Sequence, residues 1–114
     1  CLCIRIGNYG DRPLDKRRLS MWLSPRDMAQ LVRIGLEHPD IHYEIVYGSS
    51  HCERAWWDNS NAERLGYRPA DSAEDNRDHA LAETARNPEG KVSELFIGGM
   101  FCEAEFVGDP DRVR

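Results

Sequence analysis

Three consecutive cations, Lys16, Arg17 and Arg18, lie near the end of a polar loop that begins at Gly7. The loop follows residues 1–6, an apolar segment with the composition of a buried strand. Open α/β sheets bind ligands at the carboxyl ends of their strands. A guanidinium group can hold a planar carboxylate through two hydrogen bonds, and its charge does not switch off. We therefore expect this loop to close over an anionic small molecule.

The cysteines and histidines offer metal or redox chemistry, but their spacing does not favour it. No two cysteines stand in a C-x-x-C pair, and His51 and Cys52 are neighbours whose side chains point in different directions. Free structural thiols in a cytoplasmic protein are the favoured interpretation, with a metal site or a disulfide as the weaker alternatives. The histidines are scattered, and none is given a catalytic role. The cysteines are Cys1, Cys3, Cys52 and Cys102.

Composition limits the classes of partner. The chain has 114 residues, with 15 basic against 20 acidic side chains and a net charge of −5. That balance argues against nonspecific binding to nucleic acid or to an anionic membrane, which requires a basic face. No apolar run approaches the roughly 20 residues of a membrane span. The first residue is Cys1, inside an expected strand and with no signal peptide, so we expect a partial chain.

The clearest helix signal begins at Ser24. Ser24 can cap the helix, Pro25 suits its first position, and Asp27 completes a pattern like a capping box. The helix is expected to end before Pro39. The apolar stripe expected to be buried consists of Met28, Leu31, Val32 and Leu36.

Residues 41–47 are rich in β-branched and aromatic side chains and predict a strand. Together with residues 1–6 and the helix between them, they predict a β–α–β unit with parallel strands. The fold class is therefore α/β. Further expected elements are helices over residues 56–65 and 72–86, a short extended piece over 92–97 and a loose tail over 109–114.

Several spaced motifs within residues 1–106 resemble the extended short-chain dehydrogenases, the NAD-dependent epimerase/dehydratase family. The Arg-x-Leu-Ser-x-Trp-Leu-Ser run over residues 17–24 is similar to the uronate dehydrogenases of this family. The other motifs that carry the resemblance lie at residues 5–13, 46–48, 56–60, 65–74 and 96–101.

The resemblance implies the C-terminal portion of a Rossmann-type fold with about three helices, in which residues 1–108 form the substrate-binding part. The family's Gly-rich loop and its Tyr-x-x-x-Lys pair are absent from this sequence, because neither Lys16 nor Lys91 has a tyrosine four residues before it. No catalytic residue is therefore expected here. NAD would be bound mainly by residues upstream of Cys1, and this segment alone would be inactive.

The resemblance also implies site residues. Arg17 matches the arginine that holds the substrate carboxylate, while Lys16 and Arg18 are expected to face solvent or to form a positive funnel. Asn8, with Tyr9, matches the loop that meets the nicotinamide end of the cofactor, and Asn8 also borders the substrate. Phe101 matches an aromatic residue that lines the substrate pocket. The implied reaction is NAD-dependent oxidation of a hexuronic acid at C1 to an aldarolactone.

Two alternatives remain open. One is a sugar-nucleotide epimerase or dehydratase, although residues 47–69 leave little room for the larger substrate domain that such enzymes need. The other is a module that binds sugar acids without catalysis, or the remnant of a broken gene. The expected partner is a small-molecule sugar acid, with no nucleic acid and no membrane, and self-association into a homo-oligomer is left open.

Overall fold

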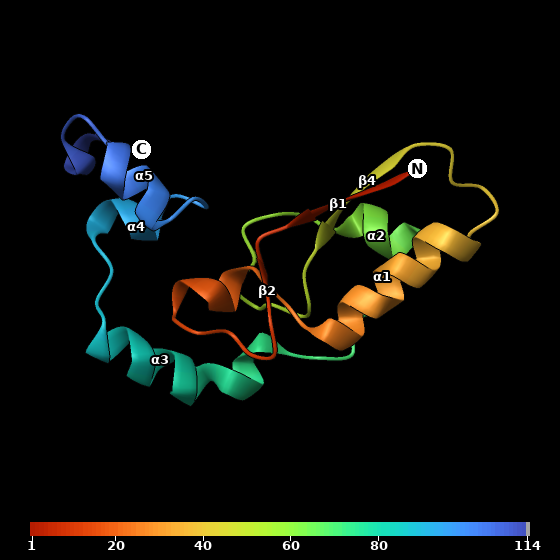
Figure 1. The fold of residues 1–114 in the computed structure, drawn as a ribbon, viewed down its shortest axis with the longest axis horizontal. Coiled ribbons are helices and arrows are strands. Elements are labelled where there is room, and N and C mark those ends of the chain that lie inside the picture. Colours follow the sequence, from red (N-terminus) through yellow and green to blue (C-terminus); the bar gives the residue numbers. More distant parts are fainter. Residues whose placement is uncertain (114) are drawn as a thin grey trace.

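The β–α–β unit predicted from the sequence forms the body of the molecule, in a computed structural model that describes residues 1–113 (Figure 1). Strand β1 (Leu2–Ile6) pairs in parallel with β4 (Glu44–Gly48), in a register that runs from Leu2 opposite Glu44 to Ile6 opposite Gly48. Helix α1 (Pro25–Glu37) connects the two strands in the chain order. The α/β class with parallel strands is therefore confirmed.

The polar loop after β1 carries a second strand pair that the sequence did not predict. Strand β2 (Asn8–Tyr9) lies parallel to β3 (Trp22–Leu23), and the Asn8 N–H donates to the Met21 carbonyl at 3.0 Å. Between these strands, the cationic run forms the 3₁₀ turn Arg17–Ser20. The loop is therefore closed at its base by backbone hydrogen bonds, which fixes where its cations emerge.

Helix α1 begins as predicted. The Asp27 N–H donates to the Ser24 Oγ at 3.1 Å, and the helix ends at Glu37, with His38 as its C-cap. The predicted apolar stripe is wrong in part, because Val32 is 42% exposed and Leu36 is 82% exposed. The apolar face that packs in the core retains Met28 and Leu31 from that stripe and adds Ile34.

The sequence predicted a helix over residues 56–65, but residues 56–59 are not helical, and Asn59 lies along strand β4. The Asn59 side chain accepts from the Tyr47 N–H at 3.1 Å and donates to the Tyr47 carbonyl at 2.9 Å, as a neighbouring strand would do. Trp57 stacks on Tyr47, with ring centroids 4.6 Å apart, whereas Trp56 is 46% exposed. Helix α2 (Ser60–Arg64) is therefore short; Leu65 is its C-cap, and Gly66 follows with a φ of +98°.

The remaining elements are more helical than predicted. Helix α3 (Arg77–Arg86) follows the 3₁₀ turn Ala73–Asn76, and the Ser72 side chain does not cap that turn. The extended piece expected over residues 92–97 is wrong, because helix α4 (Lys91–Leu95) occupies it; Val92, Leu95 and Phe96 also fit a helical i, i+3, i+4 pattern.

The end of the chain contains helix α5 (Met100–Glu105). The loose tail expected over residues 109–114 includes the 3₁₀ turn Pro110–Arg112, and its last residue lies outside the described residues. The described residues thus contain five α-helices rather than about three. Helices α4 and α5 pack on each other and stand apart from the strands, joined to α3 by a single connection (Figure 1).

Two apolar clusters hold the loops in place. The first joins α1 and β4 to α2 and the segment after it; its buried members are Leu23, Leu31, Val46, Ala62, Leu65 and Tyr67. The second lies under the cationic turn and brings it against α3; its members are Leu19, Trp22, Cys52, Ala73 and Ala80. The exposed cationic loop therefore rests on side chains that are removed from water.

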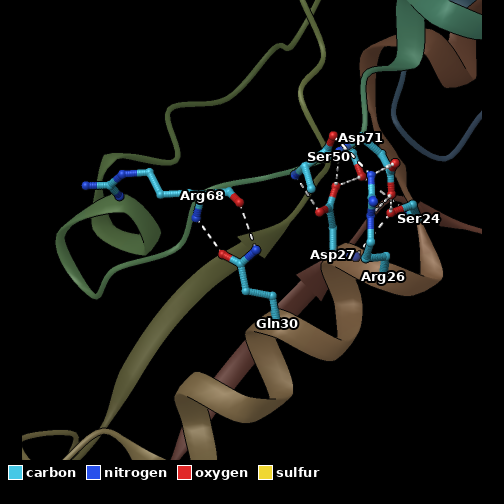
Figure 2. A network of polar contacts seen from close by, with 8 residues as sticks. Ser24, Arg26, Asp27, Gln30, Ser50, Arg68 and Asp71 are labelled. Atoms are coloured by element: carbon cyan, nitrogen blue, oxygen red, sulfur yellow. Dashed lines mark hydrogen bonds and ion pairs between the residues drawn. The ribbon is translucent and has the colours of Figure 1, made fainter.

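A buried carboxylate connects these clusters (Figure 2). Asp27 is fully buried and accepts from the Ser50 hydroxyl at 2.5 Å, the Ala70 N–H at 2.7 Å and the Asp71 N–H at 3.2 Å. The Ser24 hydroxyl donates to Asp71 at 2.6 Å, and this bond lowers the pKa of the Asp71 carboxyl. Three segments that are distant in the sequence are thereby joined at the start of α1.

All four cysteines are free thiols, and Cys52 is the buried one. Burial raises the pKa of the Cys52 thiol. Within residues 1–113, no three side chains of the metal-binding types are grouped closely enough to hold an ion. A helix of the length and apolar character that a bilayer crossing requires is also missing from this described range.

Replacement of Asp27 tests the buried junction. We expect Asp27→Asn to lower the free energy of unfolding by about 2–3 kcal/mol, because an amide NH₂ would face donors that need an acceptor. Urea titration followed by circular dichroism measures the change. As a control, Glu37→Gln removes only the exposed ion pair with Arg33 and should cost less than about 0.5 kcal/mol. Equal effects of the two substitutions would contradict the role given to Asp27.

The burial of Cys52 predicts its reactivity. At mildly alkaline pH, a thiol reagent should modify the partly exposed Cys102 first and Cys52 only after denaturant is added, because the raised pKa leaves Cys52 as the unreactive thiol form. Peptide mass spectrometry after timed labelling distinguishes the two sites. Labelling of native Cys52 as fast as Cys102 would show that the second cluster is open.

Candidate functional site

Arg17 is held in place from both sides of the cationic turn. The Asp15 side chain accepts from the Arg18 N–H at 2.9 Å, and the Lys16 N–H donates to the Thr84 Oγ1 on α3 at 2.8 Å. These bonds fix the backbone on each side of Arg17, whose side chain is only 11% exposed. Arg17 is therefore a built-in, largely buried cation and not a solvated surface residue.

The guanidinium of Arg17 reaches the far end of the chain. Its Nε donates to the Glu89 Oε2 at 3.2 Å, and its Nη1 donates to the Ile97 carbonyl at 2.9 Å and to the Met21 Sδ at 3.6 Å. Gly99 has φ +56°, and a Cβ there would lie 2.6 Å from the Arg17 Nη2. The absence of a side chain at Gly99 is therefore what allows the guanidinium to lie against this backbone.

Arg17 also lines a cavity with a volume of about 750 Å³. One side of the cavity comes from the loop after β2 and the other from α3, α4 and α5; lining residues include Arg12, Leu14, Arg17, Glu83, Glu89 and Met100. The charge on the wall is mixed, because Arg18 is paired with Asp15. Lys16 is exposed, as expected, but the cavity is not a uniformly positive funnel.

Asn8 and Tyr9 form β2, which follows the carboxyl end of β1. They line a smaller cavity of about 230 Å³, and Tyr9 is 55% exposed. Arg12 and Leu14 line this cavity and the larger one, so the two spaces share a wall. The contact of Asn8 and Tyr9 with the nicotinamide end of a cofactor stays a prediction.

Phe101 lies on the surface of α5 and is 81% exposed. Its neighbour Met100 lines the Arg17 cavity, whereas Phe101 is not among the lining residues. The expected pocket role of Phe101 stays a prediction. The sequence did not predict the part played by Glu89 or the contact between Gly99 and Arg17. The Gly-Gly pair within residues 96–101 was the signal in the sequence that could have indicated the Gly99 contact.

Comparison with solved structures defines the class of fold. Uronate dehydrogenase from Agrobacterium tumefaciens matches 90% of this chain with a TM-score of 0.80 and 34% identity, and this chain covers 38% of it. A mutant of that enzyme, complexed with NAD, matches 95% of the chain with a TM-score of 0.81 and 32% identity, and 41% of it is covered. The chain therefore has part of a Rossmann-type α/β fold, as predicted.

Sequence comparison identifies individual proteins that are related to this chain. No protein-family model matches this sequence. A uronate dehydrogenase from Pseudomonas putida is 41% identical over 101 residues, which cover 89% of this chain but only 37% of the relative. One relative, 39% identical over 74 residues, is an NAD-dependent glucose-6-phosphate dehydrogenase from Haloferax volcanii. Other relatives are uronate dehydrogenases, so the resemblance stated from the sequence is confirmed. The chain spans little more than a third of their length.

Substitution of Gly99 tests the contact with Arg17. We expect Gly99→Ala to cost roughly 1–3 kcal/mol of stability from its positive φ and, in addition, to move the guanidinium away from its present position. Gly66→Ala is the matched control, because Gly66 also has a positive φ but a Cβ there would meet nothing within 4 Å.

Urea titration gives the stability of both variants, and the NMR signal of the Arg17 Nε–H reports its surroundings. The signal should shift in Gly99→Ala and stay unchanged in Gly66→Ala. An unshifted signal in both variants would show that Gly99 does not support Arg17.

Proposed function

We propose that the protein containing this chain oxidises a hexuronic acid at C1, with NAD as the hydride acceptor, and releases an aldarolactone. In this proposal, the chain supplies the site for the substrate carboxylate. The observation that carries it is the largely buried guanidinium of Arg17 on the wall of a cavity of about 750 Å³. The names of the relatives support the same substrate class.

Arg17 suits the task of holding a sugar acid in one pose. Its Nη1 is fixed by the Ile97 carbonyl, so the plane of the guanidinium is set before a ligand arrives. A bidentate carboxylate contact on such a fixed plane restricts both the position and the rotation of the sugar ring. Oxidation at the carbon opposite the carboxylate depends on that restriction, because hydride transfer requires close alignment.

Asn8 and Tyr9 would contact the nicotinamide end of NAD, which, when bound, takes up the hydride. The Gly-rich loop and the Tyr-x-x-x-Lys pair are absent from the 114 residues, so the main cofactor contacts and the catalytic base would come from outside them. We therefore expect these residues alone to be inactive. Four free thiols support a location in the reducing cytoplasm.

Replacement of Arg17 tests this function in the full-length protein. With galacturonate or glucuronate as substrate, Arg17→Ala should lower kcat/KM for NADH formation roughly 10- to 100-fold, because a charge-assisted hydrogen bond contributes about 1.5–3 kcal/mol. Arg17→Lys should recover only part of the loss, since an ammonium group cannot reproduce the bidentate contact.

Lys16→Ala is the matched control. It removes the neighbouring cation, which is exposed, and should change kcat/KM less than about threefold. Absence of uronate-dependent NADH formation by the unmodified protein would refute the proposed function. Equal activity of Arg17→Ala and the unmodified protein would refute the role of Arg17 in it.

A further inference from the structure

We propose that Glu89 is a positioning residue that sets specificity at the Arg17 site. The Glu89 carboxylate pairs with the Arg17 guanidinium when no sugar acid is bound, and the carboxylate of the substrate takes its place. This inference rests on the proposed function. Glu89 is thus an internal competitor, which a ligand must displace before Arg17 can hold it.

The contact itself has the form of a replaceable ligand. The Arg17 Nε donates to one oxygen of Glu89 at 3.2 Å, and the Nη1 donates elsewhere, to the Ile97 carbonyl. Within residues 1–113, the Arg17 Nη2 makes no hydrogen bond. Glu89 therefore makes a single hydrogen bond to the guanidinium. A planar carboxylate that reached Nε and Nη2 together would make two hydrogen bonds.

The position of Glu89 in the chain allows it to leave. It stands in the connection over residues 87–90, between the end of α3 and the start of α4, and its side chain is 22% exposed. It also lines the same cavity of about 750 Å³ that Arg17 faces. The Ile97 carbonyl holds Arg17 independently, so departure of Glu89 does not release the guanidinium.

This arrangement favours acids over neutral sugars. A neutral sugar offers no charge to offset loss of the Arg17–Glu89 pair, so Glu89 stays and narrows the cavity. A sugar acid exchanges one carboxylate for another and gains a hydrogen bond. Glu89 thus contributes to specificity by opposing the binding of neutral sugars.

The test compares Glu89→Gln with Glu83→Gln in the full-length protein. Both remove one negative charge from the wall of the same cavity, but Glu83 pairs with Arg86 and not with Arg17. Glu89→Gln should lower the KM for galacturonate or glucuronate roughly two- to fivefold with kcat unchanged, as expected for loss of a partly exposed ion pair. Glu83→Gln should change KM less than about 1.5-fold.

A rise in KM for Glu89→Gln would overturn the inference, because it would mean that Glu89 only supports Arg17. Equal falls in both variants would overturn it as well, since they would show a general charge effect. Turnover by the unmodified protein tests the proposed function separately, so the two failures are distinguishable.

A binding measurement covers the case in which the protein shows no turnover. Acetate serves as the probe, titrated against chloride at equal ionic strength, with the NMR signal of the Arg17 Nε–H as the readout. Half-saturation should occur at a roughly two- to fivefold lower acetate concentration in Glu89→Gln than in the unmodified protein or in Glu83→Gln. Equal half-saturation in all three would overturn the inference.

Discussion

The buried carboxylate of Asp27 is the constraint on which the arrangement of the loops depends. A fully buried carboxylate is costly unless donors surround it, and here one hydroxyl and two backbone N–H groups do so. Because those donors come from the segment after β4 and from residues 70–71, both are held at the start of α1. The Ser50 N–H in turn donates to the Trp22 carbonyl at 2.8 Å, and this bond extends the constraint to β3.

Strand β3 connects the Asp27 junction to the candidate site. Strand β3 pairs with β2, which contains Asn8 and Tyr9, and the cationic turn lies between these two strands. The turn rests on Leu19 and is tied to α3 through Thr84. Backbone hydrogen bonds and a small apolar cluster thus place a cation beside the carboxyl end of a strand, where the fold class binds ligands.

Arg17 links this rigid body to the final helices. Helices α4 and α5 pack mainly on each other, and they meet the guanidinium through the Ile97 carbonyl and the backbone at Gly99. The residue that would hold a substrate carboxylate therefore also anchors these two helices. Any ligand that alters the contacts of Arg17 acts at the junction between the two parts of the molecule.

Local features of this chain follow from short stretches of its sequence. Capping at Ser24, the strand at residues 1–6 and the turn at Gly66 depend on neighbours along the chain, and the structure has all three. The spaced motifs also indicated the right relatives. In contrast, Val32 and Leu36 fit a helical stripe but lie exposed, because the side of α1 that is buried depends on where the strands pack.

Contacts between residues that are distant in the sequence are set by the packing of the folded chain. Asn59 follows the edge of β4 instead of a helix, because the Tyr47 backbone offers it a donor and an acceptor. Asp27 accounted for a capping pattern in the sequence, yet three of its hydrogen bonds cross to segments at least 23 residues away. The Arg17–Glu89 pair spans 72 residues. Such contacts cannot be predicted from the periodicity of apolar residues along the chain, because they form only after distant segments have packed together.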